Sequence, residues 1–407
     1  MGEFHQNGIV TTLHNLTRRS TEELEAELVE FSKQRKLGLV LPCLYSELEG
    51  PAMQPIVDEL AKVPYLSEII IGLDKADESQ YRKALKFFSQ LPQNYKVLWN
   101  DGPRLKKTHR QLVDAGLTTG EPGKGRNVWF CFGYAFASQG SSALALHDCD
   151  IVTYQRDLLA RLIYPVANPQ FNYTFCKGYY SRIADGKMNG RVSRLLVTPL
   201  LRALTKIFGP QEYLEYLDSF RYPLAGEFAM RTDSVQDIRI PSDWGLEIGV
   251  LAEMKRNYST NRICQADIAD VYDHKHQNLS ADNDQAGLSK MSIDISKAIF
   301  RKLATNGVVF SSETFRSIKA TYFRIALDLI ETYANDATMN GLTMDIHKEE
   351  EAVELFAANI LKAGLAFLDN PMERPFIPSW NRVSSALPQL QRSMLDAVAQ
   401  DMEEFSP

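Results

Sequence analysis

Two acidic residues flank Cys149 directly after an apolar run. Asp148 and Asp150 follow the segment 141–147, SSALALH, which has the apolar character of a buried strand. Carboxylate oxygens bind hard divalent cations such as Mg²⁺ and Mn²⁺. A cation held there would bridge the phosphates of a nucleotide sugar and act as a Lewis acid on the leaving nucleoside diphosphate. Two solvated loop carboxylates are the commoner explanation of such a pair, but the position at the end of a predicted strand favours a metal site.

Histidine is scarce in this chain, yet two of its seven histidines lie two residues apart. His274 and His276 follow Asp273, after the apolar-leaning segment 264–272. Alternate residues of a strand point to the same side, so both imidazoles could face one site. A histidine with a carboxylate partner suits Mg²⁺ or Mn²⁺. A solvated loop explains these residues equally well.

A lysine between two glycines offers a second kind of anion contact. Lys124 lies between Gly123 and Gly125, where glycine allows the backbone to approach a ligand and lysine supplies a point charge for phosphate. The tripeptide is not the GxxxxGK[ST] phosphate-binding loop. A plain turn is the commoner explanation of three such residues alone.

An arginine and a hydroxyl beside a glycine form a further candidate anion site. Gly190, Arg191 and Ser193 could grip a carboxylate or a phosphate through a fork of donors. Ser193 could also be the N-cap of the helix expected at 194–204. The two interpretations are compatible, because a helix amino terminus is itself an anion site.

Two glutamates occur among apolar and glycine neighbours. Glu227 closes the segment PLAGE at 223–227, and Glu247 lies between Leu246 and Ile248. A carboxylate in apolar surroundings is costly unless it is hydrogen-bonded or functional. We interpret Glu247 as an acceptor for sugar hydroxyls, with a helix-capping or core-satisfied glutamate as the alternative.

The elements that would position these residues alternate between strands and helices. Apolar, strand-like runs recur along the first part of the chain at 37–44, 67–74, 95–101 and 141–152. Helical patterns separate them at intervals of about 30 residues, which indicates βαβ units and a mainly parallel α/β sheet. Ligands of such sheets bind at the carboxyl ends of the strands. We therefore expect the polar residues that close these runs to gather along one edge, namely 45–47, 74–77, 100–101 and 148–150.

The rest of the chain divides into an arm and a helical extension. Residues 1–36 are polar and contain a helix that begins at Ser20 or Thr21. Residues 37–283 form the predicted catalytic domain, and 284–407 form a helical C-terminal region. Its apolar positions 318, 322, 325 and 329 share one helix face. We expect these helices to pack on the catalytic domain or on a second subunit rather than to perform chemistry.

Composition narrows the class of protein. The chain has 407 residues, a formal charge of −6 and no long run of Lys and Arg, so a nucleic-acid partner is not indicated. Its five cysteines are scattered and form no CxxC pair, which favours a reducing compartment over disulfides or a zinc cage. The start lacks the pattern of a secretion signal, and no apolar run approaches the ~20 residues that span a bilayer. We expect a cytoplasmic protein without a membrane partner.

Taken in chain order, these segments resemble the glucosyl-3-phosphoglycerate synthases, which are retaining glycosyltransferases with the GT-A fold. The matching segments are LVLPCLYSE, IIIGLD, GKG, DCD, GRVS, PLAGEF, DWGLEIGV and VYDHKH, which span about 38–280, over half of the chain. PLAGEF, GLEIG and the downstream histidine together are specific. The opening GIVTTLH looks like the start of a longer subgroup. The resemblance implies a Mg²⁺ or Mn²⁺ cofactor, a homodimer, and a product that serves as precursor of glucosylglycerate, a compatible solute.

The resemblance also implies a role for each matching residue. On the donor side, residues would contact the nucleoside, the phosphates or the hexose: Pro42, Leu44 and Glu47 at the nucleoside, Asp74 at the base or ribose, Asp148 at the ribose, Lys124 at phosphate, and Glu247 at the hexose. Asp150 and His274 would bind the metal. The acceptor residues would be Gly190, Arg191, Ser193 and His276. The catalytic residues would be Glu247, Arg191 and Asp150.

The chain departs from the pattern of the family at three places. Tyr45, Ser46 and Glu47, at the predicted base contact, stand where shorter members carry an asparagine and two glutamates. Ser193 replaces a threonine and keeps the hydroxyl, whereas His276 stands where an asparagine is often found. The compact members do not cover the long C-terminal region.

The reaction that follows is transfer of glucose from a nucleoside diphosphate to the 2-hydroxyl of 3-phosphoglycerate, with retention of configuration. A double displacement would need a carboxylate nucleophile, which the residues do not identify, so same-face substitution is favoured. One alternative is a mannosyl- or glucosylglycerate synthase that acts on D-glycerate. Two others are a nucleotidyltransferase that releases pyrophosphate and a nucleotide-sugar-binding protein without turnover. The base of the donor (UDP, GDP or ADP) and the choice of glucose over mannose stay open.

Overall fold

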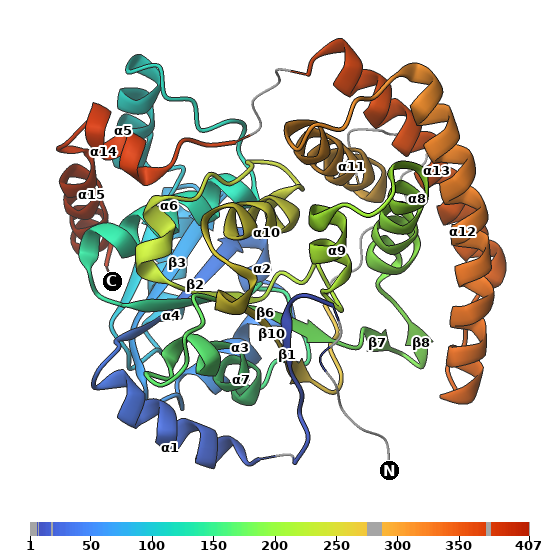
Figure 1. Ribbon diagram of the computed structural model, residues 1–407. Helices are drawn as coiled ribbons and strands as arrows, with labels where there is room; N and C mark the ends of the chain where they lie inside the picture. Colours follow the sequence, from blue (N-terminus) through green and yellow to red (C-terminus); the bar gives the residue numbers. More distant parts are fainter. Residues whose placement is uncertain (1–5, 7, 18, 275–286, 372–375, 407) are drawn as a thin grey trace.

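A mainly parallel sheet forms the centre of the molecule (Figure 1). The computed structural model describes residues 6, 8–17, 19–274, 287–371 and 376–406. Within these residues eight strands pair in the order β1-β10-β6-β9-β5-β2-β3-β4. All neighbours are parallel except β9, which is antiparallel to both β5 and β6. The strands are β1 Thr11–Leu13, β2 Leu37–Leu44, β3 Leu66–Asp74, β4 Tyr95–Trp99, β5 Ala143–Leu146, β6 Phe175–Tyr180, β9 Phe228–Arg231 and β10 Ile263–Ala269. The predicted α/β class is confirmed.

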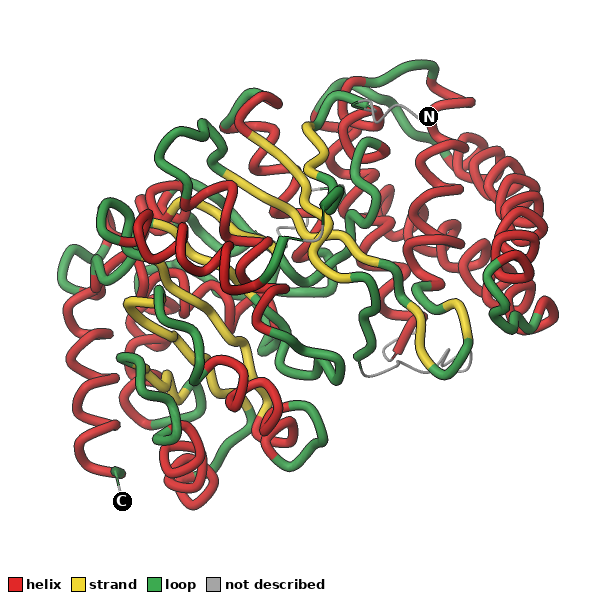
Figure 2. The backbone as a smooth tube through the Cα atoms, turned by 90° about the horizontal axis from the view of Figure 1, so that it is seen from below, coloured by secondary structure: helices red, strands yellow, loops and turns green. Residues whose placement is uncertain are grey.

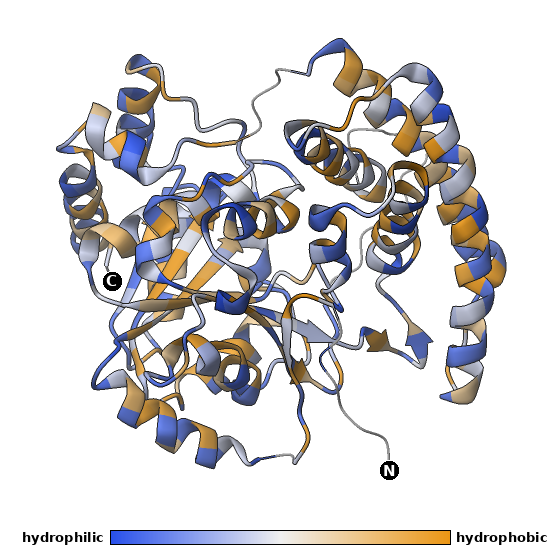
Figure 3. Ribbon diagram, in the orientation of Figure 1, coloured by the Kyte–Doolittle hydropathy of each residue, from blue (hydrophilic) through white to orange (hydrophobic). Residues whose placement is uncertain are grey.

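The central strands are apolar throughout because both faces of the sheet are covered. In β2, Leu39 and Leu41 pack into the core on one face, whereas Val40 packs into the core on the other. Figure 3 shows these strands as largely hydrophobic, with hydrophilic residues concentrated on the outer helices. The period of two along a strand therefore divides one continuous apolar run between two cores.

Helices cover both faces of the sheet. One face packs against α1 Thr21–Ser32, α3 Met53–Leu60, α4 Glu78–Phe88 and α7 Arg156–Ala167. The other packs against α5 Pro103–Asp114, α6 Lys124–Ser138, α8 Thr198–Phe208, α9 Glu212–Asp218 and α10 Leu246–Asn257. Figure 2 shows the strands running between these two layers. Short elements complete this part of the chain: α2 Tyr45–Leu48, β7 Ile183–Ala184, β8 Lys187–Met188, the π-helix η1 Val192–Val197, and the 3₁₀ turns η2 Thr232–Gln236 and η3 Thr260–Arg262.

The N-terminal segment begins as expected but also joins the sheet. Ser20 is the N-cap of α1 and forms a capping box with Glu23, which satisfies free amide groups at the helix start. The preceding strand β1, Thr11–Leu13, pairs with β10 at the sheet edge. This strand was not predicted, because three residues of mixed polarity are too few to show the alternation of apolar and polar residues that indicates a strand.

The C-terminal region divides into two parts (Figure 1). Three helices, α11 Gly287–Thr305, α12 Ser312–Met339 and α13 Ile346–Asp369, lie beside α8 and η1. Two others, α14 Trp380–Ala386 and α15 Leu390–Phe405, lie on the other side against α5, α6 and β4. Trp380 stacks on Trp129 of α6 with the ring centroids 4.1 Å apart. The same core contains residues of the part that holds the sheet and of this region, so the predicted packing of the C-terminal helices on that part is observed.

Two local predictions need correction. The apolar run at 141–152 forms a strand only over Ala143–Leu146, because the chain leaves the sheet at the acidic loop. Ser193 is not a helix N-cap: it lies inside η1, which runs directly into α8.

The predicted face of α12 is observed, with Ile318, Tyr322 and Leu329 buried. No helix in the described ranges combines the length and apolar character that a bilayer crossing requires.

Candidate active site

Polar residues gather along one edge of the sheet, as the strand pattern predicts. Asp74 ends β3 and accepts a hydrogen bond of 2.7 Å from Asn100, which follows β4. The acidic loop with Asp148 and Asp150 follows β5, and His274 follows β10. Since β9 runs antiparallel to its neighbours, its amino end brings Glu227 to the same edge.

Lys124 joins two of the predicted donor residues. Its Nζ lies 2.6 Å from Oδ1 of Asp148 and 3.1 Å from Oε1 of Glu247. Lys124 is the first residue of α6, and Glu247 is in the first turn of α10. Burial would lower the pKa of Lys124, but Asp148 and Glu247 together raise it above its usual range. The lysine therefore stays charged and holds both carboxylates in place.

Gly125 explains how Lys124 comes so close to α10. A Cβ at this position would lie 2.0 Å from the backbone oxygen of Pro241, in the segment that leads to α10. Only glycine fits between the two backbones. Gly125 is therefore a packing residue, and the plain-turn interpretation of GKG does not apply because α6 begins at Lys124.

Asp150 and His274 lie side by side, with Oδ2 of Asp150 3.6 Å from Nδ1 of His274. The backbone holds them there, since His274 forms a β-bridge with Ile151. Oδ1 of Asp150 and both ring nitrogens of His274 are buried without a hydrogen-bond partner among the described residues. Such unsatisfied atoms need an explanation, and a bound ion is one.

The residues fit a divalent cation of the kind that takes few protein ligands. Ligand atoms lie ~2.0–2.2 Å from Mg²⁺ or a similar metal, so one ion reaches both side chains. The described part of the chain contains no group of three or more His, Cys, Asp or Glu side chains that could hold a metal. Mg²⁺ usually keeps waters and binds one or two carboxylates plus substrate phosphates. That Asp150 and His274 bind the metal stays a prediction.

One cavity of about 220 Å³ brings the predicted groups together. Lys124, Asp148, Glu247 and His274 form one part of its lining, and Gly190 and Arg191 form another. Gly190 has φ 79°, a left-handed conformation that glycine adopts without strain. Residues predicted to contact the donor, the metal and the acceptor thus come from separate parts of the sequence and line a single space, although Asp150 is not part of its lining.

Two predicted acceptor residues are not part of this lining. Ser193 is 8% exposed inside η1 and does not line the cavity. His276 lies outside the described residues, which stop at His274 before the gap at 275–286.

Arg182 is a cavity residue that the sequence interpretation missed. It follows β6, lines the cavity, and donates to Oη of Tyr222 at 3.5 Å. Its Nε is buried without a partner among the described residues. Burial would lower the pKa of Arg182, but Tyr222 and the neighbouring tyrosines raise it, so the group is a permanent cation. No motif marked this arginine, because it stands in a hairpin rich in polar residues.

A buried carboxylate, Glu227, is hydrogen-bonded to two tyrosines beside the cavity. Glu227 is 0% exposed and accepts hydrogen bonds of 2.6 Å from Tyr180 and Tyr272, whose rings stack 3.7 Å apart. Burial raises the pKa of Glu227, and Asp148 raises it further. Tyr272 is two residues before His274 and contacts its ring. The apolar neighbours of Glu227 in the sequence indicated a hydrogen-bonded or functional carboxylate, although no role was predicted for this residue.

The predicted nucleoside residues occupy the neighbouring strands. Leu44 of β2 pairs with Asp74 of β3, and Pro42 pairs with Gly72. Glu47 follows in α2. Burial raises the pKa of Asp74 to about 6. These residues do not line the 220 Å³ cavity, and their contact with a nucleoside stays a prediction.

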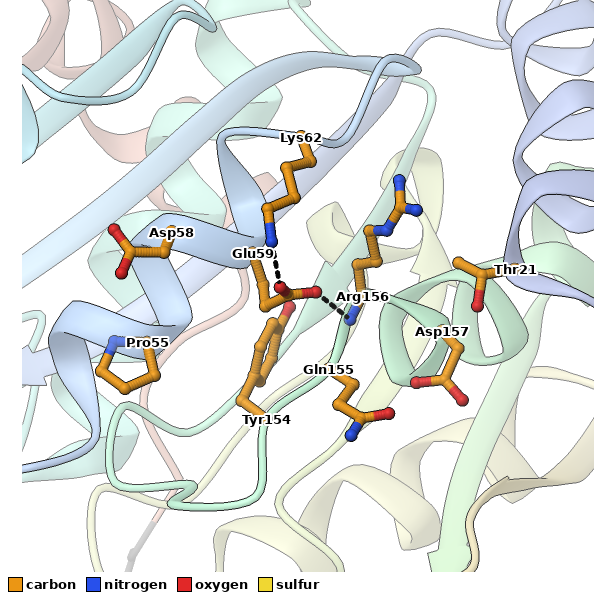
Figure 4. A pocket seen from close by; sticks show the side chains of 9 residues that line it. All are labelled: Thr21, Pro55, Asp58, Glu59, Lys62, Tyr154, Gln155, Arg156 and Asp157. Carbon is orange, nitrogen blue, oxygen red and sulfur yellow. Dashed lines mark hydrogen bonds and ion pairs between the residues drawn. The ribbon is translucent and has the colours of Figure 1, made fainter.

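A second hollow, of about 560 Å³, lies between α3 and the start of α7 (Figure 4). Glu59 in its wall pairs with Lys62 and accepts from the backbone of Arg156. The guanidinium of Arg156 pairs with Glu22 and Glu25 of α1. The two basic side chains of its lining, Lys62 and Arg156, are thus paired with glutamates, and the hollow contains none of the predicted site residues.

The chain is similar along nearly its whole length to proteins named glucosyl-3-phosphoglycerate synthase. It is 47% identical over 401 residues to the glucosyl-3-phosphoglycerate synthase of Persephonella marina, which covers 98% of this chain and 99% of that protein. It is 39% identical over 407 residues to the enzyme of the same name from Methanococcoides burtonii, with 99% of each chain covered. No protein-family model matches the chain.

Solved structures of glucosyl-3-phosphoglycerate synthase from Mycobacterium tuberculosis share the fold. The complex of that enzyme with Mn²⁺, UDP-glucose and phosphoglyceric acid gives a TM-score of 0.52 at 20% identity, covering 74% of this chain and 89% of that one. Its complex with Mg²⁺ and UDP gives 0.52 at 19% identity, covering 75% and 89%. This likeness confirms the predicted GT-A fold.

Proposed function

This chain belongs to the family of glucosyl-3-phosphoglycerate synthases, and from that premise we propose how its cavity moves glucose from a nucleoside diphosphate to the 2-hydroxyl of 3-phosphoglycerate. The observation that supports the assignment of residues is the shared cavity. Lys124, Asp148 and Glu247 line one part of it and Gly190 and Arg191 another. A group transfer requires donor and acceptor to be held at reacting distance, which one small space achieves.

The donor would lie along the edge of β2, β3 and β5. Lys124 would contact a phosphate of the nucleotide, and Asp148, its ion-pair partner at 2.6 Å, would contact the ribose. Glu247 would accept hydrogen bonds from the hexose hydroxyls, because its side chain is 12% exposed and lines the cavity. Pro42, Leu44, Glu47 and Asp74 would surround the nucleoside.

Asp150 and His274 would hold the cation. A bound Mg²⁺ or Mn²⁺ supplies Lewis-acid stabilisation of the negative charge that develops on the leaving nucleoside diphosphate. The β-bridge between Ile151 and His274 would hold the backbone of the two ligand residues side by side. Of the two carboxylates that flank Cys149, Asp148 would thus contact the donor and Asp150 would bind the metal.

The acceptor would bind through arginines. 3-Phosphoglycerate carries a carboxylate and a phosphate, and the planar guanidinium group binds either through two parallel hydrogen bonds. Arg191 and Arg182 both line the cavity and supply such groups. Gly190 would let the backbone approach the same anion.

The carboxylates in and under the cavity favour same-face substitution over double displacement. Asp148 and Glu247 are both paired with Lys124, and Glu227 is fully buried under two tyrosine hydroxyls. A covalent intermediate needs an activated carboxylate, and these carboxylates are already engaged. In same-face substitution the leaving phosphate takes the proton of the acceptor hydroxyl, and the configuration is retained.

A matrix of donors and acceptors tests this function. UDP-, GDP- and ADP-glucose and the corresponding mannose donors are each combined with 3-phosphoglycerate or D-glycerate and with Mg²⁺ or Mn²⁺, and nucleoside-diphosphate release is measured. We expect release with a glucose donor and 3-phosphoglycerate, and loss of release with a chelator. Preference for D-glycerate would establish the glycerate synthase instead, and release of pyrophosphate would establish a nucleotidyltransferase.

The setting of the reaction is also proposed. We place the enzyme in the cytoplasm as a homodimer that makes the precursor of glucosylglycerate, a compatible solute. All five cysteines are buried and free, which agrees with a reducing compartment. Light scattering of the purified chain measures the oligomeric state directly.

A further inference from the structure

The segment that carries Arg191 is held by the C-terminal helices. We call residues 182–197 the acceptor segment: it contains the hairpin β7–β8, Gly190, Arg191 and η1. Thr343, between α12 and α13, donates its backbone N–H to the carbonyl of Gly186 at the hairpin tip, 2.8 Å away. Tyr322 of α12 donates its hydroxyl to the carbonyl of Leu195 in η1 at 2.5 Å. Both ends of the segment are therefore fixed from the same region.

Glu349 of α13 fixes the middle of the segment. Its Oε1 accepts from Nε of Arg191 at 2.7 Å, and its Oε2 accepts from Nη2 of Arg194 at 2.8 Å. The Glu349 side chain is 3% exposed, so water screens this charge little. One buried carboxylate thus pairs with two arginines and orients both, and charge-assisted hydrogen bonds of this kind are the strong ones.

Arg194 anchors the arrangement. Its Nε donates to the carbonyl of Asn189 at 2.9 Å, and its guanidinium lies 4.9 Å from the ring centroid of Tyr333 on α12. Its side chain is 11% exposed, compared with 34% for Arg191. Arg194 is therefore the structural member of the pair, and Arg191 is the member that reaches the cavity.

The contact with Glu349 leaves the two terminal nitrogens of Arg191 free to bind an anion. Glu349 uses Nε of Arg191, and within the described residues Nη1 and Nη2 have no hydrogen-bond partner. A guanidinium held by one edge presents its remaining donors in a fixed direction, which lowers the entropy lost when an anion binds. Helix α11 adds Leu288, Met291 and Ile295 to the cavity lining, so the extension borders the same space.

We propose that Glu349 is a positioning residue for the acceptor: it holds Arg191 in the orientation that binds 3-phosphoglycerate. The inference rests on the proposed function and deepens it, because it gives the C-terminal extension a role in acceptor affinity. Glu349 acts through Arg191 and touches no substrate itself. Its effect therefore falls on acceptor binding and spares the donor.

The variant Glu349→Gln tests this role, with Glu354→Gln as the matched control. Both glutamates are on α13, but Glu354 is exposed to solvent. Glutamine keeps the size and removes the charge that both arginines need. We expect the KM for 3-phosphoglycerate to rise about tenfold or more, with the donor KM and kcat within about twofold, as expected for lost uniform binding. Glu354→Gln should behave as the wild type.

Further measurements separate positioning from a general structural role. Calorimetric titration with 3-phosphoglycerate in the absence of donor should show the same loss of affinity, and Glu349→Asp, which keeps the charge, should recover part of it. Thermal unfolding of each variant is recorded alongside. Equal rises in both KM values, or a wild-type acceptor KM in a folded Glu349→Gln variant, would overturn the inference and leave the proposed function standing. Absence of any wild-type transfer to 3-phosphoglycerate would overturn both.

Discussion

Gly226 lies directly against the carboxylate of Asp148, a predicted donor contact, so one added methyl group at Gly226 should have a large effect. A Cβ on Gly226 would lie 2.3 Å from Oδ2 of Asp148, whereas ordinary contact begins at 3.4 Å. Gly226 is not in the left-handed region, so Gly226→Ala adds no backbone strain. The methyl group must instead displace the carboxylate of Asp148 by about 1 Å.

The size of the effect follows from the ion pair that Asp148 makes. Oδ1 of Asp148 lies 2.6 Å from Nζ of Lys124. Lengthening this separation by about 1 Å at an effective dielectric constant of about 20 costs about 2 kcal/mol. A loss of the same size in the proposed contact between Asp148 and the bound donor would lower kcat/KM about 30-fold.

Steady-state kinetics with each substrate varied in turn measures this effect. We expect kcat/KM for the nucleoside-diphosphate-glucose donor to fall about 30-fold in Gly226→Ala, with the KM for 3-phosphoglycerate nearly unchanged. The contrast with Glu349→Gln is informative, because that variant should affect the acceptor and spare the donor. Thermal unfolding establishes that the variant is folded.

A double-mutant cycle decides whether the clash acts through Asp148. Asp148→Asn, Gly226→Ala and the double variant are compared, and the double variant should be no worse than Asp148→Asn alone, since contacting residues are not additive. Wild-type kcat/KM in Gly226→Ala, or losses that multiply in the double variant, would refute the reasoning.

Other predictions follow from the same geometry. Asp150→Ala should abolish transfer while the melting temperature stays near that of the wild type; normal turnover with added Mg²⁺ would contradict the metal assignment. Burial raises the pKa of Asp74 to about 6, so its ionised form destabilises the folded state above that pH. Asp74→Asn should therefore unfold at higher denaturant concentration than the wild type at pH 8, by up to about 3 kcal/mol, and the advantage should vanish below about pH 4. Trp380→Ala removes the stack on Trp129 and a 3.0 Å hydrogen bond, and should lower the free energy of unfolding by about 3–5 kcal/mol, as urea titration would measure. An unchanged midpoint would show that α14 does not stabilise α6.

The parts of the fold that were predictable are those with a local physical signature. The run at 37–44 is apolar at successive positions, which in a chain of this composition indicates a strand covered on both faces, and β2 has these bounds. The helix after Ser20 carries its own cap, and α1 begins there. Strand direction then places the ends of β3 and β5 at one edge, so the sequence predicts Asp74 and Asp148 along that edge.

Features without a local signature were missed or misassigned. Strand β1 is three residues long and exists because β10 offers an unpaired edge. Ser193 has the residue type of an N-cap, but the chain forms a π-helix there, with Tyr322 of a distant helix bonded to one of its carbonyls. Arg182 belongs to no motif and becomes a cavity residue only when the hairpin folds beside η1.

By itself the sequence determined the alternating sheet, the edge at which ligands bind, and the residue types available there, because these depend on short-range periodicity and strand direction. Tertiary structure alone decided which charges meet. Lys124 and Glu247 form an ion pair although they are 123 residues apart in the sequence. Arg191 and Glu349 form another, although they are 158 residues apart. Such pairs depend on how helices from separate parts of the chain pack on one another, and no local pattern of residues encodes that distance.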